Sequence, residues 1–501
     1  MSDEKKTAQE PSAEKKPVPE EKTSITRHTL VLNGKELTYT VTAGTLLLKE
    51  EDEAEGEKPK AMIFYVAYEL QGETPVAERP ITFSFNGGPG SSSVWMHLGM
   101  LGPMRVLLDE EGMPLPPPYQ LVPNDFSLLD KTDLVFIDPV STGFSRPVPG
   151  QKAEEFHNVK RDIESVGDFI QRFTTRNKRW ASPKFLIGES YGTTRAAGLS
   201  GYLQERHGMY LNGIMLISSI INFLTARFNP GNDLPYALFL PSYTATAWYH
   251  KRLSPDLQAD LSATLRESEA FAGKDYILAL MKGVRLVGEE REQVVRKLAR
   301  LTGLSETYIE QTDLRIDIHR FCKQLRRDED LAVGRLDSRY IGKDRDSAGE
   351  IYERDPSYSA TLGPYTAMLN DYLRSELEFE SDLTYEILTS LFKTWKYDDA
   401  QNQYVNTGET LREGFLLNPA LKVFVANGYF DLATPYFATQ YTFDHLGLPA
   451  EFMDKIRFAY YQAGHMMYLH LPSLRQLKAD LDAFIDEAVN KKAESSKLKA
   501  G

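Results

Sequence analysis

The 501-residue chain has a single cysteine, no long apolar stretch and no excess of positive charge. Cys322 alone has no partner for an intramolecular disulfide, and a lone cysteine also excludes a cysteine-rich zinc or iron–sulfur site. No segment approaches the roughly 18 consecutive apolar residues of a transmembrane helix. With 71 acidic and 58 basic side chains the net charge is −13, which repels the phosphates of nucleic acids and of anionic membranes. We therefore expect that the protein binds neither nucleic acid nor a membrane.

Both ends of the chain lack residues that a core could bury. Residues 1–26 are mostly Glu, Lys, Pro, Ala and Ser, so burial cannot offset the entropy lost on ordering, and we predict a disordered tail there. The Lys-, Ser- and Ala-rich residues 491–501 predict a second, flexible tail. The start also lacks the apolar segment of a secretory signal peptide, which makes the cytoplasm the default expectation for the location of the protein.

Between these tails the apolar residues follow two patterns. Residues 28–48 and 61–70 are rich in β-branched and aromatic side chains and predict strands, and we interpret the hydrophilic tract 49–60 between them as an exposed hairpin loop. From Ile81 onward, short continuous apolar runs alternate with amphipathic helical stretches, which is typical of a parallel sheet buried on both faces. Strands are predicted at 81–85, 132–138, 184–188, 213–219, 421–428 and 456–461, and helices at 154–176, 193–206 and 472–488.

The alternation stops over residues 224–416, where the pattern becomes largely helical. An insertion of this size between two strands of one sheet predicts a helical cap over the carboxyl ends of the strands. The expected organisation is therefore one α/β domain, made of residues 27–223 and 417–490, that the cap splits in two.

The sharpest chemical signal is Gly188-Glu189-Ser190-Tyr191-Gly192, which follows an apolar strand and leads directly into a helical pattern. This is the context of a nucleophile elbow. Both glycines are needed because the turn strains the serine, and side chains two residues to either side would collide with neighbouring backbone. The alternative is a glycine-lined turn with an idle serine, and the strand before and helix after favour catalysis by Ser190.

A serine nucleophile needs a base, and the base needs a third group that orients it. Asp431 comes three residues after a predicted strand, and His465 follows the last strand across a small Ala-Gly pair. Taken singly, the aspartate fits a helix cap and the histidine fits a surface or core residue. Because both follow strand ends, in the order serine, aspartate, histidine, we interpret Ser190, Asp431 and His465 as a catalytic triad.

Acyl transfer also needs two hydrogen-bond donors that face the developing oxyanion. The backbone N–H of Tyr191 supplies one of them. The glycine-rich turn Asn86-Gly87-Gly88-Pro89-Gly90, after the first parallel strand, is the candidate for the other. Its alternatives are a simple tight turn or a phosphate loop, and it lacks the Lys-Ser/Thr ending of a nucleotide-binding loop.

Five segments, in this order, resemble the serine carboxypeptidases, α/β-hydrolases that remove C-terminal amino acids. They are FNGGPGSSS (85–93), IDPVSTGFSRP (137–147), GESYG (188–192), NGYFDLATP (427–435) and AGHMM (463–467). The resemblance runs from about residue 81 to residue 471. It implies the α/β-hydrolase fold, with a mostly parallel central sheet and a largely helical cap.

The resemblance also implies a role for each matching residue. Ser190 would attack the last peptide bond, His465 would act as base and then as acid, and Asp431 would orient the imidazole. A neutral or protonated group would bind the substrate's free carboxylate, because an ionised glutamate would repel it. The further residues so implied are Gly88 and Tyr191 in the oxyanion hole, Asn86, Gly87 and Glu189 at the substrate carboxylate, and Met466 in the substrate pocket.

Four positions depart from the family's pattern. Because Met100 replaces a second glutamate that shares a proton with Glu189, we expect weaker dependence on acidic pH than the family shows. A usual proline is Tyr468, which we expect to remodel the pocket wall near Met466. The remaining departures are Ser84 for a tryptophan and Ser91 for a half-cystine.

Three functions fit these observations. The first is a serine-type carboxypeptidase acting on peptides with a free C-terminus. The sequence leaves open whether the protein forms a homodimer. The second is an esterase or acyltransferase, since the same triad and oxyanion hole cleave esters. The third is a non-catalytic binding or protective protein, against which the complete triad argues. His465 and His470 have no carboxylate partner at helical spacing, so we expect no metal, and no cofactor is implied.

Overall fold

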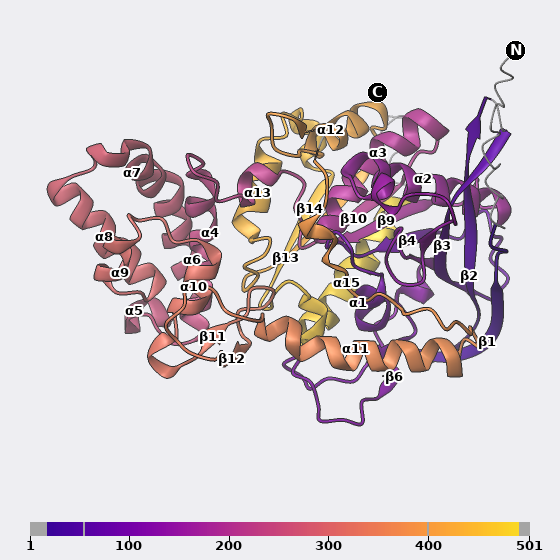
Figure 1. The fold of residues 1–501 in the computed structure, drawn as a ribbon, viewed down its shortest axis with the longest axis horizontal. Helices are drawn as coiled ribbons and strands as arrows, with labels where there is room; N and C mark the ends of the chain where they lie inside the picture. Colours follow the sequence, from indigo (N-terminus) through magenta and orange to yellow (C-terminus); the bar gives the residue numbers. More distant parts are fainter. Residues whose placement is uncertain (1–17, 54–55, 398–399, 490–501) are drawn as a thin grey trace, which may run out of the picture.

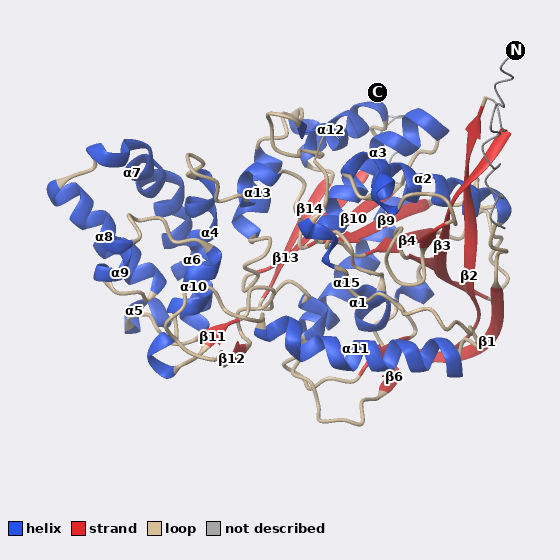
Figure 2. Cartoon of the chain, viewed as in Figure 1, coloured by secondary structure: helices blue, strands red, loops and turns tan. Residues whose placement is uncertain are grey.

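The computed structural model describes residues 18–53, 56–397 and 400–489. These residues contain a ten-stranded sheet with the order β1-β2-β3-β7-β4-β9-β10-β13-β14, in which β8 pairs with β3 (Figures 1 and 2). The strands from β7 to β14 in this order are parallel, whereas β1, β2, β3 and β7 pair antiparallel. The strands are β1 Thr23–Leu32, β2 Lys35–Asp52, β3 Gly56–Leu70, β4 Ile81–Phe85, β7 Asp133–Ile137, β8 Arg146–Pro147, β9 Lys184–Glu189, β10 Gly213–Ile217, β13 Lys422–Gly428 and β14 Ile456–Tyr461.

Helices cover both faces of the sheet. Successive side chains of β9 point to opposite faces: Ile187 joins the apolar cluster with α11 and α15, and Leu186 joins the cluster with α2, α3 and α12. Burial on both faces explains the continuous apolar runs of the predicted strands. The helices of this core are α1 Val94–Met96, α2 Val159–Arg176, α3 Tyr191–His207, α11 Pro356–Ser375, α12 Gly408–Leu417, α13 Tyr436–Asp444, α14 Ala450–Met453 and α15 Leu471–Val489.

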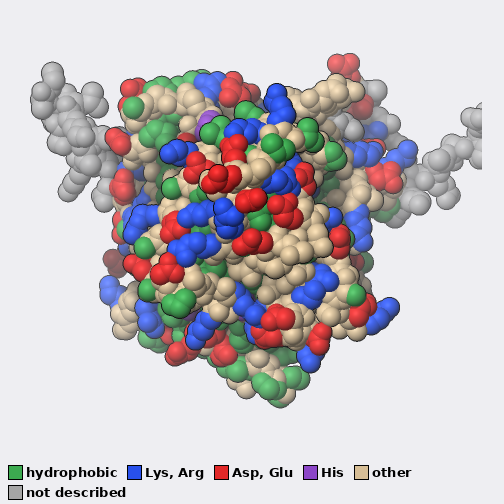
Figure 3. Space-filling view, turned by 90° about the vertical axis from the view of Figure 1, so that its left-hand side faces the viewer, with side chains coloured by type: hydrophobic (Ala, Val, Ile, Leu, Met, Phe, Trp, Pro, Cys, Tyr) green, Lys and Arg blue, Asp and Glu red, His purple; other side chains and the backbone are tan. Residues whose placement is uncertain are grey.

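The remaining helices form a lobe with its own apolar core, seen at the left of Figure 1. The end of the lobe carries basic and acidic side chains side by side rather than a patch of one sign (Figure 3). Like the other helices of the described residues, those of the lobe do not combine the length and apolarity needed to cross a bilayer. They are α4 Leu234–Tyr249, α5 Pro255–Gln258, α6 Leu261–Phe271, α7 Ile277–Lys282, α8 Gly288–Thr302, α9 Glu306–Gln311 and α10 Ile318–Gln324.

The structure divides the segment 224–416, which the sequence predicts to be one cap, between this lobe and the core. Helix α11 lies along the core, where Tyr365 and Leu369 join the apolar cluster beneath the sheet. Helix α12 packs on α3 through Leu411. A helical pattern identifies helices but not the surface that each one covers, so the sequence boundary of the cap was too wide. Two short ribbons complete the fold, β5 Met104–Val106 with β6 Leu121–Pro123, and β11 Ala332–Val333 with β12 Ile341–Gly342.

Two predictions near the amino terminus are wrong in part. The disordered tail was predicted to reach residue 26, but strand β1 begins at Thr23 and pairs there with Gly44 of β2. Residues 1–17 and the predicted tail 491–501 lie outside the described residues. Residues 23–26 belong to the edge strand of an exposed ribbon and are therefore mostly polar. A polar edge strand resembles a disordered tail in composition.

The hydrophilic tract 49–60 is also not a loop along its whole length. Strands β2 and β3 pair through most of it, with a register shift after Leu48. Lys49 lies 2.8 Å from Glu57, and Lys60 lies 3.1 Å from Glu50. Opposite charges across neighbouring strands stabilise a ribbon that has no apolar face to bury. The charged side chains that suggested a loop therefore pair across the two strands.

Candidate active site

Ser190 lies at a sharp turn between β9 and α3. Its φ of 59° and ψ of −129° are in a region that residues other than glycine rarely adopt. A Cβ on Gly188 would lie 2.2 Å from the carbonyl oxygen of Gly192, and a Cβ on Gly192 would lie 2.8 Å from that of Phe85. Both positions therefore require glycine, and the predicted strand–turn–helix arrangement is present.

His465 and Asp431 form a buried pair beyond the ends of β14 and β13. Nδ1 of His465 lies 2.7 Å from Oδ2 of Asp431, and the two side chains are 4% and 0% exposed. Because the carboxylate accepts, Nδ1 carries the proton and Nε2 is left free to accept another. The pair thus has the geometry of an oriented general base.

Two contacts connect this pair to the serine. The N–H of Ser190 donates to the carbonyl of Ile217 at 3.0 Å, and the hydroxyl of the next residue, Ser218, donates to the carbonyl of His465 at 2.6 Å. The four strands β9, β10, β13 and β14 are adjacent and parallel, so their carboxyl ends meet at one edge of the sheet. The hydroxyl of Ser190 has no hydrogen bond to another residue of the described chain. In unliganded sites such contacts often tighten only when substrate binds.

Asp431 is surrounded by donors. The N–H groups of Ala433 and Thr434 donate to Oδ1 at 2.7 and 3.0 Å, and the hydroxyl of Thr434 lies 2.7 Å from Oδ2. Burial raises the pKa of Asp431, but the charge of His465 and these hydrogen bonds lower it by more, so the pKa lies below its ordinary value. For His465 burial lowers the pKa, and the charge and hydrogen bond of Asp431 outweigh burial and leave the pKa raised.

The glycine-rich turn lies directly against the elbow. A Cβ on Gly87 would come within 2.4 Å of the amide nitrogen of Tyr191. Gly88 has a φ of +105°, which favours glycine. Within the described chain neither the amide of Gly88 nor that of Tyr191 donates to another group. Two free N–H donors next to Ser190 are what an oxyanion hole requires.

A buried ion pair that the sequence analysis missed holds the turn and the elbow helix together. Arg195 of α3 lies 2.8 Å from Asp162 of α2 and also donates to the carbonyl oxygen of Asn86 at 2.8 Å. Arg195 is 1% exposed. Its signal in the sequence is an arginine among the small residues of a buried helix, which indicates a fixed charge partner.

Glu189 has a phenol as its partner. Nδ2 of Asn86 donates to Oε1 at 2.9 Å, and the hydroxyl of Tyr468 donates to Oε2 at 2.5 Å. Met100, which stands where the family carries a second glutamate, is buried in the apolar core. Burial raises the pKa of Glu189, while the charge of His465 and the bonds from Tyr468 and Asn86 lower it by less. Because Met100 supplies no carboxyl, Glu189 has the phenol of Tyr468 as a donor in place of a second carboxyl, and this donor adds no second carboxyl proton.

Ser91 and Ser84, which also depart from the family's pattern, differ in their contacts. The hydroxyl of Ser91 accepts a hydrogen bond from the indole of Trp95 at 3.0 Å. The hydroxyl of Ser84 is buried and has no partner among the described residues. Met466, predicted in the substrate pocket, is 5% exposed and belongs to the apolar cluster beneath the sheet.

A short segment of the insertion supports both loops of the predicted triad, and the sequence analysis missed it. The carbonyl of Leu336 accepts the N–H of His465 at 2.6 Å, and Oδ2 of Asp337 accepts the N–H of Gly464 at 3.1 Å. On the other side, the N–H of Ser338 donates to the carbonyl of Phe430, one residue before the aspartate. Residues 336–338 therefore position the aspartate and the histidine together.

The described residues contain no group of three or more His, Cys, Asp and Glu side chains arranged to hold a metal ion. Cys322 is fully buried in the lobe, where burial raises the pKa of its thiol well above the ordinary value. A buried thiol of this kind is inert.

Comparison with known proteins identifies the family. A model of the serine carboxypeptidase family matches residues 53–467. The serine carboxypeptidase ctsa-3.2 of Caenorhabditis elegans is 26% identical over 209 residues, which cover 39% of this chain and 35% of that protein. The pheromone-processing carboxypeptidase KEX1 of Saccharomyces cerevisiae is 31% identical over 158 residues, which cover 30% of this chain and 20% of that protein. The chain thus spans about a third or less of the length of these relatives.

A solved structure agrees in fold. The crystal structure of a prohormone-processing carboxypeptidase from Saccharomyces cerevisiae superposes with a TM-score of 0.54 at 16% identity, covering 89% of this chain and 91% of that one. The sheet order, the elbow and the split core are those of an α/β-hydrolase. Because the family model matches most of its length, the chain belongs to the serine carboxypeptidase family.

Proposed function

We propose that the protein is a serine carboxypeptidase that releases C-terminal amino acids from peptides through an acyl-enzyme intermediate. The observation that carries this proposal is the buried Asp431–His465 pair at the same sheet edge as the strained Ser190. Family membership supports the same activity.

In the proposed reaction Ser190 Oγ attacks the carbonyl carbon of the last peptide bond and gives its proton to Nε2 of His465. Asp431 stabilises the imidazolium that forms. The N–H groups of Gly88 and Tyr191 donate to the oxyanion of the tetrahedral intermediate. The intermediate collapses, the C–N bond breaks, and His465 returns the proton to the leaving amine. Water then attacks the acyl-serine by the same sequence of proton transfers.

Selection of the last residue needs recognition of a free carboxylate. We assign this to Asn86, the N–H of Gly87 and Glu189, which lie together beside the elbow. A raised pKa keeps Glu189 protonated to higher pH than an exposed glutamate, and a protonated carboxyl can donate to a carboxylate that an ionised one would repel. The phenol of Tyr468 fixes the orientation of Glu189 from the opposite side.

One experiment separates this activity from its alternatives. Hydrolysis of an N-blocked dipeptide is compared with that of its C-terminal amide and of a simple ester, with Ser190→Ala as the control. Preference for the free acid supports a carboxypeptidase, and cleavage of the ester alone shows an esterase. If a serine-directed phosphonylating reagent labels neither wild type nor Ser190→Ala, the protein is a non-catalytic binding protein.

A further inference from the structure

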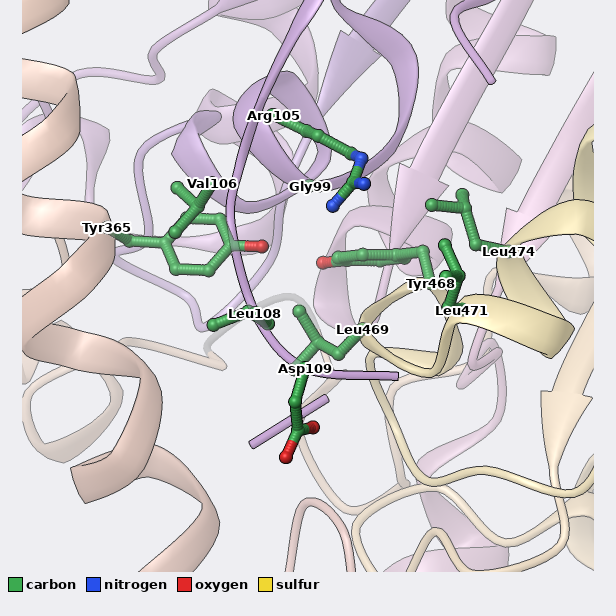
Figure 4. Close-up of a pocket in the computed structure, with 10 residues that line it drawn as sticks. All are labelled: Gly99, Arg105, Val106, Leu108, Asp109, Tyr365, Tyr468, Leu469, Leu471 and Leu474. Atoms are coloured by element: carbon green, nitrogen blue, oxygen red, sulfur yellow. The ribbon is translucent and has the colours of Figure 1, made fainter. Parts of the chain in front are cut away.

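Behind Glu189 lies a cavity lined by leucines at one end and by an arginine and two tyrosines at the other (Figure 4). It has about 20 Å³ of room for the centres of water-sized molecules and is continuous with the solvent. Arg105 comes from strand β5, Tyr365 from α11, and Tyr468 from the short 3₁₀ helix Met467–Leu469 that follows His465. The site is therefore assembled from three distant parts of the chain.

Arg105 has a guanidinium without a protein partner. None of its N–H groups donates to another group in the described residues, and its Nε is buried. Burial lowers the pKa of Arg105, which Tyr365 and Asp125 oppose, and a guanidinium remains charged at any physiological pH. A half-buried cation whose buried Nε–H has no partner favours an anion, which can accept that hydrogen bond and balance the charge.

The two tyrosines converge on the same space. Tyr365 is 1% exposed, and its hydroxyl has no hydrogen-bond partner among the described residues. Figure 4 shows the hydroxyls of Tyr365 and Tyr468 directed toward each other below the guanidinium. A Cβ on Gly99 would lie 2.7 Å from the hydroxyl of Tyr365 and 2.7 Å from the ring of Tyr468, so only glycine allows this approach. The cavity thus has a constructed polar end.

We propose that this cavity binds a small anion of the carboxylate type, held by the guanidinium of Arg105 and the hydroxyl of Tyr365. The planar guanidinium matches a carboxylate in shape and donates two parallel hydrogen bonds to it. Leucines 469, 471 and 474 exclude water from the far side, which strengthens these bonds.

Three carboxylates bear on the charge balance of this site. Asp109 lines the cavity, but its carboxylate is turned away from the guanidinium in Figure 4 and accepts the N–H of Met113. Asp125 acts on Arg105 without forming an ion pair with it in the described structure. Glu189 lies behind the hydroxyl of Tyr468. The guanidinium charge is therefore available to an anion from outside.

Binding is tested by thermal unfolding of the full-length protein in sodium formate and in sodium gluconate at equal ionic strength. Formate is the smallest carboxylate, whereas gluconate carries five further carbon atoms. We expect formate to raise the Tm by about 1 °C or more in a saturable way. Arg105→Met should abolish the difference and Tyr365→Phe should reduce it, whereas Arg345→Met, which removes an arginine with an 82% exposed side chain, should keep it. Equal Tm values of the wild type in the two salts, or a full shift in Arg105→Met, would overturn the proposal.

The carboxylate has two possible sources, the substrate or free anions, and kinetics distinguish them. This second measurement rests on the proposed function, whereas the Tm measurement does not, so failure of the activity leaves the binding test intact. If formate competes with a peptide acid but not with an ester, and Arg105→Met raises KM for the acid alone, the cavity takes the substrate's own carboxylate in place of the site at Asn86, Gly87 and Glu189. If formate alters the rates of both substrates equally, it takes a free anion.

Discussion

Two buried carboxylates lie within the same site, and their surroundings shift their pKa values in opposite directions. Asp431 is 0% exposed and has a lowered pKa, and Glu189 is 4% exposed and has a raised one. Burial raises the pKa of both carboxyl groups. Asp431 contacts an imidazole that can become a cation and also receives two backbone N–H groups. Glu189 accepts hydrogen bonds from the neutral amide of Asn86 and the neutral phenol of Tyr468.

Because burial raises the pKa of both groups, the difference between them comes from how strongly their partners oppose burial. A carboxylate that orients a base has to stay ionised, because it must stabilise the imidazolium during the reaction. A carboxyl that meets a substrate carboxylate has to be neutral. In the proposed reaction the site separates these two tasks, because Asp431 bonds to an imidazole that becomes a cation and Glu189 bonds to neutral donors.

The largest expected effect comes from neutralising each carboxyl in turn. Asp431→Asn should lower kcat about 10⁴-fold, because an amide cannot stabilise the imidazolium and disturbs the tautomer of His465. The isosteric change Glu189→Gln should lower kcat less than about tenfold, since a neutral group already meets the substrate. Steady-state kinetics on an N-blocked dipeptide measure both variants. Equal losses in the two would show that the carboxyls have the same task.

The second prediction concerns pH and uses the titration of Glu189. The ratio of kcat/KM for a peptide acid to that for an ester cancels the titration of His465, which both substrates need. Because the neutral form of Glu189 binds the acid, we expect the ratio to fall about tenfold per pH unit above the raised pKa of Glu189. In Glu189→Gln the ratio should not change with pH. A ratio that falls in this variant as well would assign the titration to another group.

Removing the phenol should act on stability in a pH-dependent way. The folded-state pKa of Glu189 is raised, so its protonation contributes stability that is present at low pH and is lost as pH rises through that pKa. Tyr468→Phe removes a donor to the ionised form, and we expect the free energy of unfolding to fall by about 1–3 kcal/mol above that pKa and by less below it. Urea denaturation at acidic and at neutral pH measures this. Tyr429→Phe, whose hydroxyl makes no hydrogen bond in the described residues, is the control, and a loss equal at both pH values would contradict the assignment.

The smallest effect should come from removing one of the hydrogen-bond donors to Asp431. Thr434→Val removes a hydroxyl 2.7 Å from Oδ2, while the bonds from His465 and two N–H groups remain. We expect kcat on an ester to fall about tenfold or less, which corresponds to a single hydrogen bond of about 1 kcal/mol. Thr442→Val, whose hydroxyl bonds within α13, should leave kcat unchanged. A loss as large as that of Asp431→Asn would mean that Thr434 orients the whole loop.

Much of the core could be predicted because its signals are local. The predicted strands 81–85 and 456–461 match β4 and β14 residue for residue, and the helix predicted at 193–206 lies within α3. A strand buried on both faces, such as β4, must be mostly apolar, so its position can be predicted from the sequence. The elbow could also be predicted, because its two glycines and its serine lie within five consecutive residues.

The supports of the site could not be predicted because they join distant residues. Tyr468 meets Glu189 across 279 positions of sequence, and Arg195 meets Asp162 across 33. The segment around Asp337 comes from the insertion, where the pattern predicts helices rather than an irregular stretch that supports two loops. Composition and periodicity report burial but not the partner, so each of these contacts needed the three-dimensional structure.

The late position of β13 and β14 in the sequence sets when the protein could first act. His465 is synthesised 275 residues after Ser190, which at about 5–20 residues per second means roughly 14–55 s later. During that interval the elbow and the glycine-rich turn exist without a base. The last two parallel strands must add to β10 before a proton can leave the serine. Under the proposed function, a nascent chain would therefore be unable to cleave peptides around it until nearly all of its core has been made.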